Sequence, residues 1–134
     1  MKKFVLLKLI GMVILTMAGL VAISFFEVAV YSYILNPNQD QSVYEAHANA
    51  TAPYISAIFG FIIFFLIGAV WKKNGVENGK QLSWWFPLTY FIMDIVIVSI
   101  AGIKWSDYLL IFMFSNLAKF IGSLSGFNLT KKTV

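Results

Sequence analysis

The feature that most constrains this chain is a succession of four apolar stretches, each long enough to cross a lipid bilayer as a helix. A hydrocarbon core of about 30 Å takes about 20 helical residues at about 1.5 Å each. We expect spans over residues 9–35, 53–71, 84–103 and 107–127, which leave no room in 134 residues for a separate soluble domain. The sequence predicts one all-helical membrane domain, an antiparallel four-helix transmembrane bundle.

Composition agrees with this prediction and excludes several classes of function. Hydrophobic residues make up 60% of the chain and charged residues 12%, whereas a soluble domain has roughly 45–50% apolar and about 25% charged residues. Cysteine is absent, which excludes disulfides, thiolate metal sites and cysteine nucleophiles. The net charge of +4 lies mainly in short hydrophilic segments, so we expect the lipid bilayer, and no nucleic acid, as a partner.

The lysines predict the orientation, because basic residues near the ends of spans stay on the cytoplasmic side. Eight of them precede the first span, separate the second from the third, or follow the fourth: Lys2, Lys3, Lys8, Lys72, Lys73, Lys80, Lys131 and Lys132. Only Lys104 falls on the opposite side. Both termini are therefore expected in the cytoplasm. The four tryptophans lie at predicted span ends, where aromatic side chains anchor helices at the interface.

The predicted outer loop, residues 36–52, contains signals for a turn followed by a helix. Asn36-Pro37-Asn38 is typical of a turn, and Ser42 with Glu45 fits the capping box that begins a helix. We expect a short helix along the outer membrane surface. Pro53 follows about three turns later, so this segment is expected to meet the second span at a kink.

Small residues predict where the helices pack, because close approach of backbones in lipid requires them. The second span has a continuous small stripe, and the first and fourth spans have shorter ones. The expected helix-packing residues are Ala18, Ala22, Ser56, Gly60, Gly68, Gly122 and Gly126. We expect these contacts within the bundle rather than in a dimer, since four helices must pack first; any remaining small stripe is available to a homo-oligomer.

Three polar residues are predicted near one plane inside the membrane. Asp94 is ten residues beyond Trp84, which places it about 15 Å from the inner boundary, and Asn116 and Lys119 are nine and twelve beyond Asp107, which places them about 14 and 18 Å from the outer boundary. Asn116 and Lys119 share a helix face. The turn at 103–107 is short enough to hold the third and fourth spans side by side. The sequence therefore predicts an Asp94–Lys119 ion pair bridged by Asn116.

Glu27 is the second carboxylate in the predicted spans, about 9–14 Å below the outer boundary. Tyr31 follows it by one turn, and Tyr90 precedes Asp94 by one turn. We expect Glu27 to join a buried polar cluster with the composition Glu27, Asp94, Asn116, Lys119, Tyr31 and Tyr90. This cluster contains two carboxylates and one amine, so one carboxylate is left unpaired. Low dielectric favours its neutral form, as a proton carrier requires.

Enzymatic function is not favoured by the sequence. His47 is the single histidine, on the predicted outer loop, where we expect it to be solvated. Asp40, Glu45 and Asp107 have no recognisable metal-ligand spacing. The sequence also lacks HExxH, GxSxG and a Gly-rich phosphate loop, so no catalytic residue, metal or cofactor is expected.

Two classes of function are compatible with an intramembrane polar cluster. In one, the chain or its oligomer moves a proton, an ion or a small solute. In the other, it is a non-catalytic accessory or assembly subunit of a larger membrane complex, and the cluster fixes helix register. We expect the inner membrane of a bacterium as its location. The alternative is the endoplasmic reticulum of a eukaryote, because Lys131-Lys132-Thr133-Val134 has the form of a dilysine retrieval signal.

Overall fold

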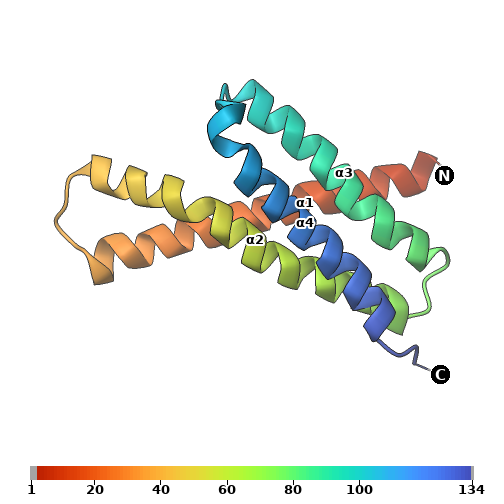
Figure 1. Cartoon of the computed structure of the whole chain (residues 1–134). Helices are drawn as coiled ribbons and strands as arrows, with labels where there is room; N and C mark the ends of the chain where they lie inside the picture. Colours follow the sequence, from red (N-terminus) through yellow and green to blue (C-terminus); the bar gives the residue numbers. More distant parts are fainter. Residues whose placement is uncertain (1–2, 134) are drawn as a thin grey trace.

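The chain folds into four long helices joined by short turns in the computed structural model, which describes residues 3–133 (Figure 1). The elements are α1 (Lys3–Val30), a short π-helical turn η1 (Tyr31–Leu35), α2 (Gln41–Lys73), α3 (Gly79–Ile100) and α4 (Trp105–Leu129). Each of the four long helices is long and apolar enough to cross a membrane. The prediction of an all-helical chain with four such helices is confirmed.

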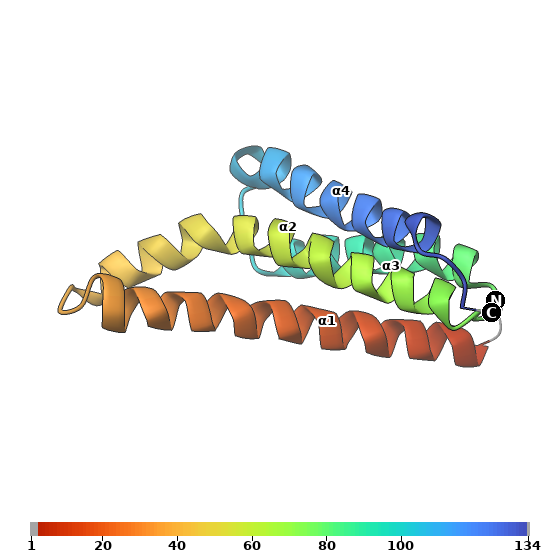
Figure 2. The same cartoon turned by 90° about the horizontal axis from the view of Figure 1, so that it is seen from below.

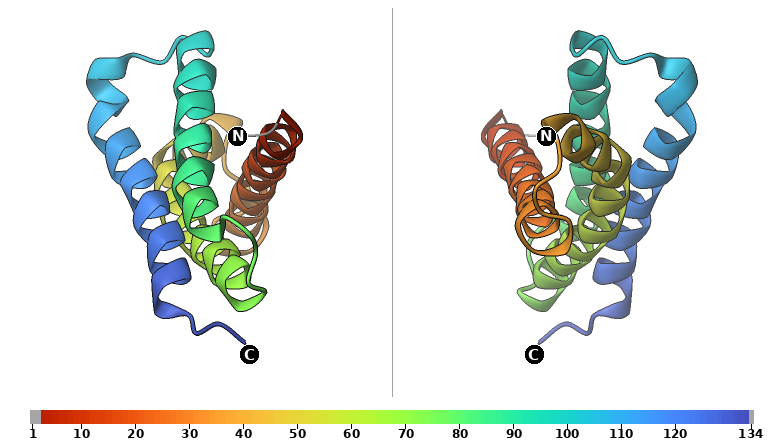
Figure 3. Two further views of the ribbon diagram at one scale, coloured as in Figure 1. Left: turned by 90° about the vertical axis from the view of Figure 1, so that its right-hand side faces the viewer. Right: turned by 90° about the vertical axis from the view of Figure 1, so that its left-hand side faces the viewer.

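Successive helices run in opposite directions and form two hairpins. The hairpin of α1 and α2 is the longer, and its far end extends beyond the turn that joins α3 to α4 (Figures 1 and 2). Figure 3 shows α1 and α4 on opposite sides of the molecule, with α2 and α3 between them. Helix α2 packs most closely against α4. The far end of the first hairpin is therefore built by α1, η1 and α2 alone.

The structure does not contain the separate surface helix predicted for the outer loop. Helix α2 begins at Gln41, with Asp40 at its N-cap, and continues without interruption to Lys73. The residues expected to lie along the surface are its first three turns. Pro53 lies inside this helix and has no N–H to bond to the carbonyl group of Asn49, which is a common cause of bending. Figure 2 shows that α2 is bent in its yellow section.

Glycines allow α2 and α4 to approach closely. A Cβ at Gly122 would lie 2.6 Å from the carbonyl oxygen of Phe61. A Cβ at Gly126 would collide with the carbonyl oxygen of Phe65, and one at Gly68 would collide with that of Ser123. Backbone atoms cannot move aside as a flexible side chain can, so these positions accept no side chain without separating the two helices.

The small residues of α1 do not pack as predicted. Ala18 and Ala22 are exposed on the outside of the helix. The buried face of α1 consists of Leu9, Val13, Thr16 and Leu20. Ala18 and Ala22 each follow a residue of this face by two positions, which is about 200° around a helix of 3.6 residues per turn. The apolar face of α1, not its small stripe, determines which side is buried.

An aromatic core lies where α1, α2 and α3 meet. Phe64 and Phe86 stack with ring centroids 4.5 Å apart, and Tyr90 meets Phe64 edge-on at 5.4 Å. Phe64 and Phe86 are both fully buried, and Val13 of α1 completes this layer. Such aromatic contacts contribute beyond the apolar area that they bury. Here they join α2 to α3, and Val13 adds α1 to the same core.

Candidate functional site

The polar residues predicted to form one cluster lie in two separate clusters. The hairpin cluster joins α1 and η1 to α2 and consists of Glu27, Tyr31, His47 and Thr51. The central cluster joins α2, α3 and α4 and consists of Ser56, Tyr90, Asp94, Ser115, Asn116 and Lys119. The prediction that Glu27 joins Asp94 and Lys119 is therefore wrong: its partners come from the first turns of α2.

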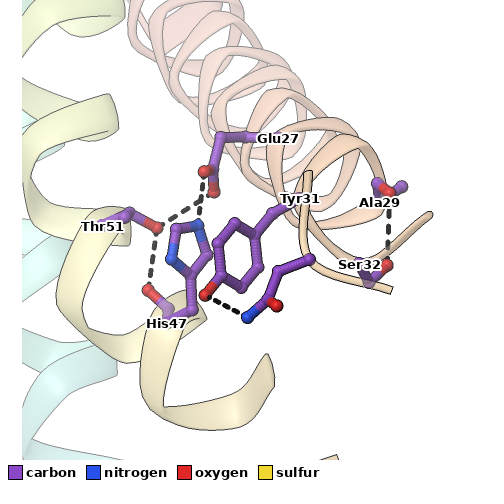
Figure 4. A network of polar contacts seen from close by, with 7 residues as sticks. Glu27, Ala29, Tyr31, Ser32, His47 and Thr51 are labelled. Carbon is purple, nitrogen blue, oxygen red and sulfur yellow. Dashed lines mark hydrogen bonds and ion pairs between the residues drawn. The ribbon is translucent and has the colours of Figure 1, made fainter. Parts of the chain in front are cut away.

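Both carboxylate oxygens of Glu27 have partners in the hairpin cluster (Figure 4). Oε1 lies 2.6 Å from Nε2 of His47, and Oε2 accepts a hydrogen bond from Oγ1 of Thr51 at 3.0 Å. Oγ1 of Thr51 also lies 3.0 Å from the carbonyl oxygen of His47. A hydroxyl group has one hydrogen, so Thr51 alternates between these two acceptors or shares its hydrogen between them. The contact of Glu27 with His47 does not depend on which acceptor Thr51 takes.

Tyr31 fixes the plane of the His47 ring. The two rings are nearly parallel, with an interplanar angle of 3° and centroids 3.6 Å apart. The hydroxyl group of Tyr31 accepts a hydrogen bond from Nδ2 of Asn36 at 3.0 Å, and Tyr44 donates to the carbonyl oxygen of Asn36 at 2.9 Å. The turn at the end of the hairpin is thereby tied to the imidazole, which holds its Nε2 toward Glu27.

The spacing of Glu27 and His47 around the turn is a sequence signal for this pairing. Glu27 and His47 each lie ten residues from Pro37, the centre of the turn, and equal distances place two residues side by side in an antiparallel helical hairpin. Tyr31 and Thr51 follow them by four residues and so lie on the same faces. The expectation that His47 is solvated is wrong, because its ring stacks on Tyr31, its Nε2 contacts Glu27, and its side chain is only 21% exposed.

Lys119 is the most buried member of the central cluster, with 1% of its surface exposed. Its ammonium group donates to Oγ of Ser56 at 2.9 Å and to Oγ of Ser115 at 2.8 Å. It also lies 4.9 Å from the centroid of the Tyr90 ring. Two hydroxyl acceptors and an aromatic face compensate part of the cost of burying this charge, and they connect α4 to α2 and α3.

Asp94 is held by Asn116 and not by Lys119. Nδ2 of Asn116 donates to Oδ2 of Asp94 at 3.0 Å and lies 3.1 Å from the carbonyl oxygen of Phe112. These two acceptors fix the amide with its nitrogen toward Asp94. Within residues 3–133 the one ion pair is Glu27 with His47, so the predicted Asp94–Lys119 ion pair is not formed. Asn116 was expected to bridge Asp94 and Lys119, but within residues 3–133 it bonds to Asp94 and not to Lys119.

The Asp94 carboxylate lies on the wall of a cavity of about 580 Å³. All four helices contribute to this wall, which contains Ser24, Asn49, Ser56, Tyr90, Asp94 and Tyr108 among its polar residues. Ser24 lies one turn before Glu27, and Asn49 lies between His47 and Thr51 along the chain. The cavity therefore extends from beside the hairpin cluster to the central cluster.

A second cavity, of about 660 Å³, lies between the opposite ends of α1, α2 and α3. Its wall includes Lys8, Met12, Trp71, Glu77 and Leu82. Along each of these helices, the residues that separate the two cavities include at least one fully buried apolar side chain: Val13 in α1, Phe64 in α2, and Phe86 and Pro87 in α3. Val13, Phe64 and Phe86 thus form an apolar layer with one cavity on each side of it, toward opposite ends of the molecule.

In residues 3–133, four apolar helices surround a cavity at each end of an apolar layer, and the Asp94 carboxylate lies on the wall of one of them. No protein-family model matches the chain, and no curated protein or solved structure matches it either. Among the described residues no group of three or more His, Asp or Glu side chains is placed to hold a metal ion. The chemistry that these residues offer is proton exchange, hydrogen bonding and charge recognition.

Proposed function

We propose that the chain spans a membrane four times, with both termini in the cytoplasm. The lysine-rich segments gather at one end of the structure, because Thr133 donates to the carbonyl oxygen of Lys73 at 3.3 Å and Lys8 shares a cavity with Glu77. Lys104 lies in the turn at the opposite end of α3. Positive residues favour the cytoplasmic side. The location that this supports is a bacterial inner membrane, with the endoplasmic reticulum as the alternative.

We further propose that the chain or its oligomer moves a proton, an ion or a small solute across this membrane. The observation that carries the proposal is the pair of cavities on opposite sides of one apolar layer. A carrier needs access from each side and a barrier between them, and buried ionisable groups at membrane depth are typical of such paths. Here the barrier is the layer of Val13, Phe64 and Phe86.

The two polar clusters have different roles in this proposal. Glu27 and His47 exchange a proton across their 2.6 Å contact, since a carboxyl group and an imidazole ring can each carry one. Asp94 is the charge that a transported species meets inside the cavity. Lys119 holds α4 against α2 and α3 through Ser56 and Tyr90, which also line the cavity. A shift of Lys119 would therefore move the cavity wall.

Proton flux into liposomes tests this proposal. The purified chain is reconstituted into liposomes that contain a pH-sensitive dye. The outside is made acidic, and a potassium ionophore lets potassium ions leave so that proton entry builds up no opposing voltage. We expect flux above that of empty liposomes, and at least a tenfold loss in Glu27→Gln, which keeps an acceptor for Thr51 but carries no charge. The matched control is Glu45→Gln, because Glu45 is exposed and its one side-chain partner within residues 3–133 is Gln41, at 2.7 Å. Equal flux in both variants would exclude Glu27 as the proton carrier.

One observation favours the second candidate, an accessory subunit of a larger membrane complex. The Lys119 amine is fully buried and already bonded to two serines, as in a purely architectural contact. Native mass spectrometry of the chain, extracted in mild detergent from its own host, separates the candidates. A homo-oligomer or monomer without other proteins supports the carrier, and a stoichiometric second protein supports the subunit.

A further inference from the structure

We propose that the cavity beside Asp94 binds a monovalent organic cation, a substituted ammonium ion with small apolar groups. The proposal rests on the transport function proposed above, for which it names the substrate class. Three observations carry it: the sign of the charge on the cavity wall, the size of the cavity, and the mixture of apolar and aromatic side chains around the carboxylate.

The charge that a ligand meets in this cavity is negative. Asp94 is the one charged side chain on the wall in the described part of the chain. Its Oδ2 accepts one hydrogen bond from Asn116, and no hydrogen bond to Oδ1 is formed among residues 3–133. Lys119 is close, but it is 1% exposed and its ammonium group is directed to Ser56 and Ser115. A cation can therefore reach its counter-charge in the cavity, whereas an anion cannot reach Lys119.

The size and lining of the cavity suit an organic ion better than a metal ion. A volume of about 580 Å³ falls in the range of about 300–1,000 Å³ that is typical of sites for small organic ligands. Leu20 and Ile97 provide apolar wall, and the half-buried Tyr108 provides a phenol ring. Aromatic faces and a single carboxylate attract quaternary and substituted ammonium ions. Divalent metals instead require several oxygen or nitrogen ligands converging on one point, and Asp94 stands alone.

A substituted ammonium ion also explains why Asp94 is not paired with Lys119. A direct ion pair would neutralise the carboxylate and close the site. Asn116 holds the carboxylate by a neutral donor and leaves its charge available, while Lys119 is retained by hydroxyl groups. The incoming cation and the Asp94 carboxylate then form an ion pair in a site of low dielectric, where their attraction is strong.

Equilibrium dialysis of the purified full chain in mild detergent tests the proposal with three probes of one shape. Phenyltrimethylammonium is the cation, tert-butylbenzene is its neutral carbon isostere, and benzenesulfonate is an anion. Detergent without protein corrects for partition into micelles. We expect saturable binding of the cation with at least tenfold preference over the other two probes. Binding of the neutral probe with equal affinity, preference for the anion, or absence of saturable cation binding would each overturn the proposal.

Two variants assign the binding to this cavity. Asp94→Asn keeps an acceptor for Asn116 but removes the charge, and we expect at least a tenfold loss of cation binding. Ile97→Trp keeps Asp94 and fills the cavity, and its matched control is Ile100→Trp on the exposed surface of α3, where Ile100 is 81% exposed. We expect loss of binding in the first tryptophan variant only. Binding that survives both Asp94→Asn and Ile97→Trp would place the cation elsewhere.

The binding and flux experiments fail independently. If Glu27-dependent proton flux is observed but the cation does not bind, the substrate class is wrong and the carrier stands. If the cation binds in an Asp94-dependent way but no flux is observed, the cavity is a binding site and the carrier is wrong. Absence of both would remove both proposals.

Discussion

Gly60 of α2 and Lys119 of α4 face each other so closely that a Cβ at position 60 would lie 2.8 Å from Cε of the lysine and 3.1 Å from its Cγ. The missing side chain of Gly60 is the space that the lysine stem occupies. Ser56 lies one turn before Gly60 on the same face and accepts from the lysine amine. Packing and polar contact are therefore linked: the glycine admits the stem, and the serine bonds its charged end.

This relationship predicts the effect of adding one methyl group. Gly60→Ala forces the buried Lys119 stem to shift and weakens its bonds to Ser56 and Ser115. We expect destabilisation of about 1–3 kcal/mol, the usual cost of overpacking a well-packed site. The measurement is thermal unfolding in mild detergent followed by tryptophan fluorescence.

Gly19→Ala is the control for this substitution. Nothing lies within 4 Å of a Cβ at Gly19, so the helix gains the intrinsic preference for alanine, about 0.5–1 kcal/mol, and loses no contact. The change in stability should thus have opposite signs at the two glycines. A Gly60→Ala variant as stable as Gly19→Ala would show that Lys119 does not lie over Gly60.

The fold could be predicted from the sequence because bilayer-length apolar helices have a simple physical signature. The packing of Ser56, Gly60 and Gly68 against α4 follows the same logic, since only small residues permit that approach. Ala18 and Ala22 show its limit. Smallness permits contact without causing it, and the side of α1 that faces the bundle was set by larger apolar side chains, whose pattern is obscured in a helix that is apolar all round.

Single cysteines test the proposed orientation in a chain that has none. Asn38→Cys lies in the turn between α1 and α2, and Asn74→Cys lies in the turn between α2 and α3; both positions are exposed. With both termini in the cytoplasm, a membrane-impermeant maleimide should label position 38 in intact cells and position 74 only after permeabilisation. The reverse pattern would invert the topology, and equal labelling of both from outside would indicate insertion in two orientations.

The Glu27–His47 contact predicts an energetic coupling between the two helices of the first hairpin. The single variants Glu27→Gln and His47→Gln and their combination form a double-mutant cycle. The side chains are 33% and 21% exposed, respectively, so we expect a coupling free energy of about 1 kcal/mol for this partly screened pair. Unfolding at pH 7 in mild detergent provides the four stabilities.

Gln41 and Glu45 offer a matched cycle in the same helix. Their side chains bond at 2.7 Å but are exposed and four residues apart, an arrangement that contributes only about 0.2–0.5 kcal/mol. A Glu27–His47 coupling no larger than that of Gln41 and Glu45 would mean that the hairpin cluster does not hold α1 to α2.

The candidate site was predictable only in part. Depth counting placed Asp94, Asn116 and Lys119 near one plane, and the structure brings Asn116 to Asp94. It could not show that Lys119 turns toward Ser56 and Ser115, because residue depth does not determine the direction of a side chain around the helix. The partner of Glu27 was missed for a different reason: residues 41–52 continue α2 instead of lying along the surface, and this carries His47 and Thr51 back alongside α1.

Replacement of Lys119 by methionine separates an architectural role from a functional one. Methionine retains an unbranched apolar stem for the space beside Gly60, and the hydroxyl groups of Ser56 and Ser115, which are 3.3 Å apart, can bond to each other without the amine. Lys119 has no ion-pair partner within residues 3–133, so its replacement by an apolar side chain of similar length removes the cost of burying a charge and breaks no buried ion pair. We therefore expect Lys119→Met to unfold at the same temperature as the native chain or higher. If Lys119 couples the cavity wall to transport, proton flux into liposomes should nevertheless fall at least tenfold.

Lys119→Ala is the control for this substitution. It leaves a void and should be destabilised by about 2–5 kcal/mol. A stable Lys119→Met variant with native flux would make the lysine purely architectural, and a variant that fails to fold would mean that its charge is needed to assemble α2, α3 and α4.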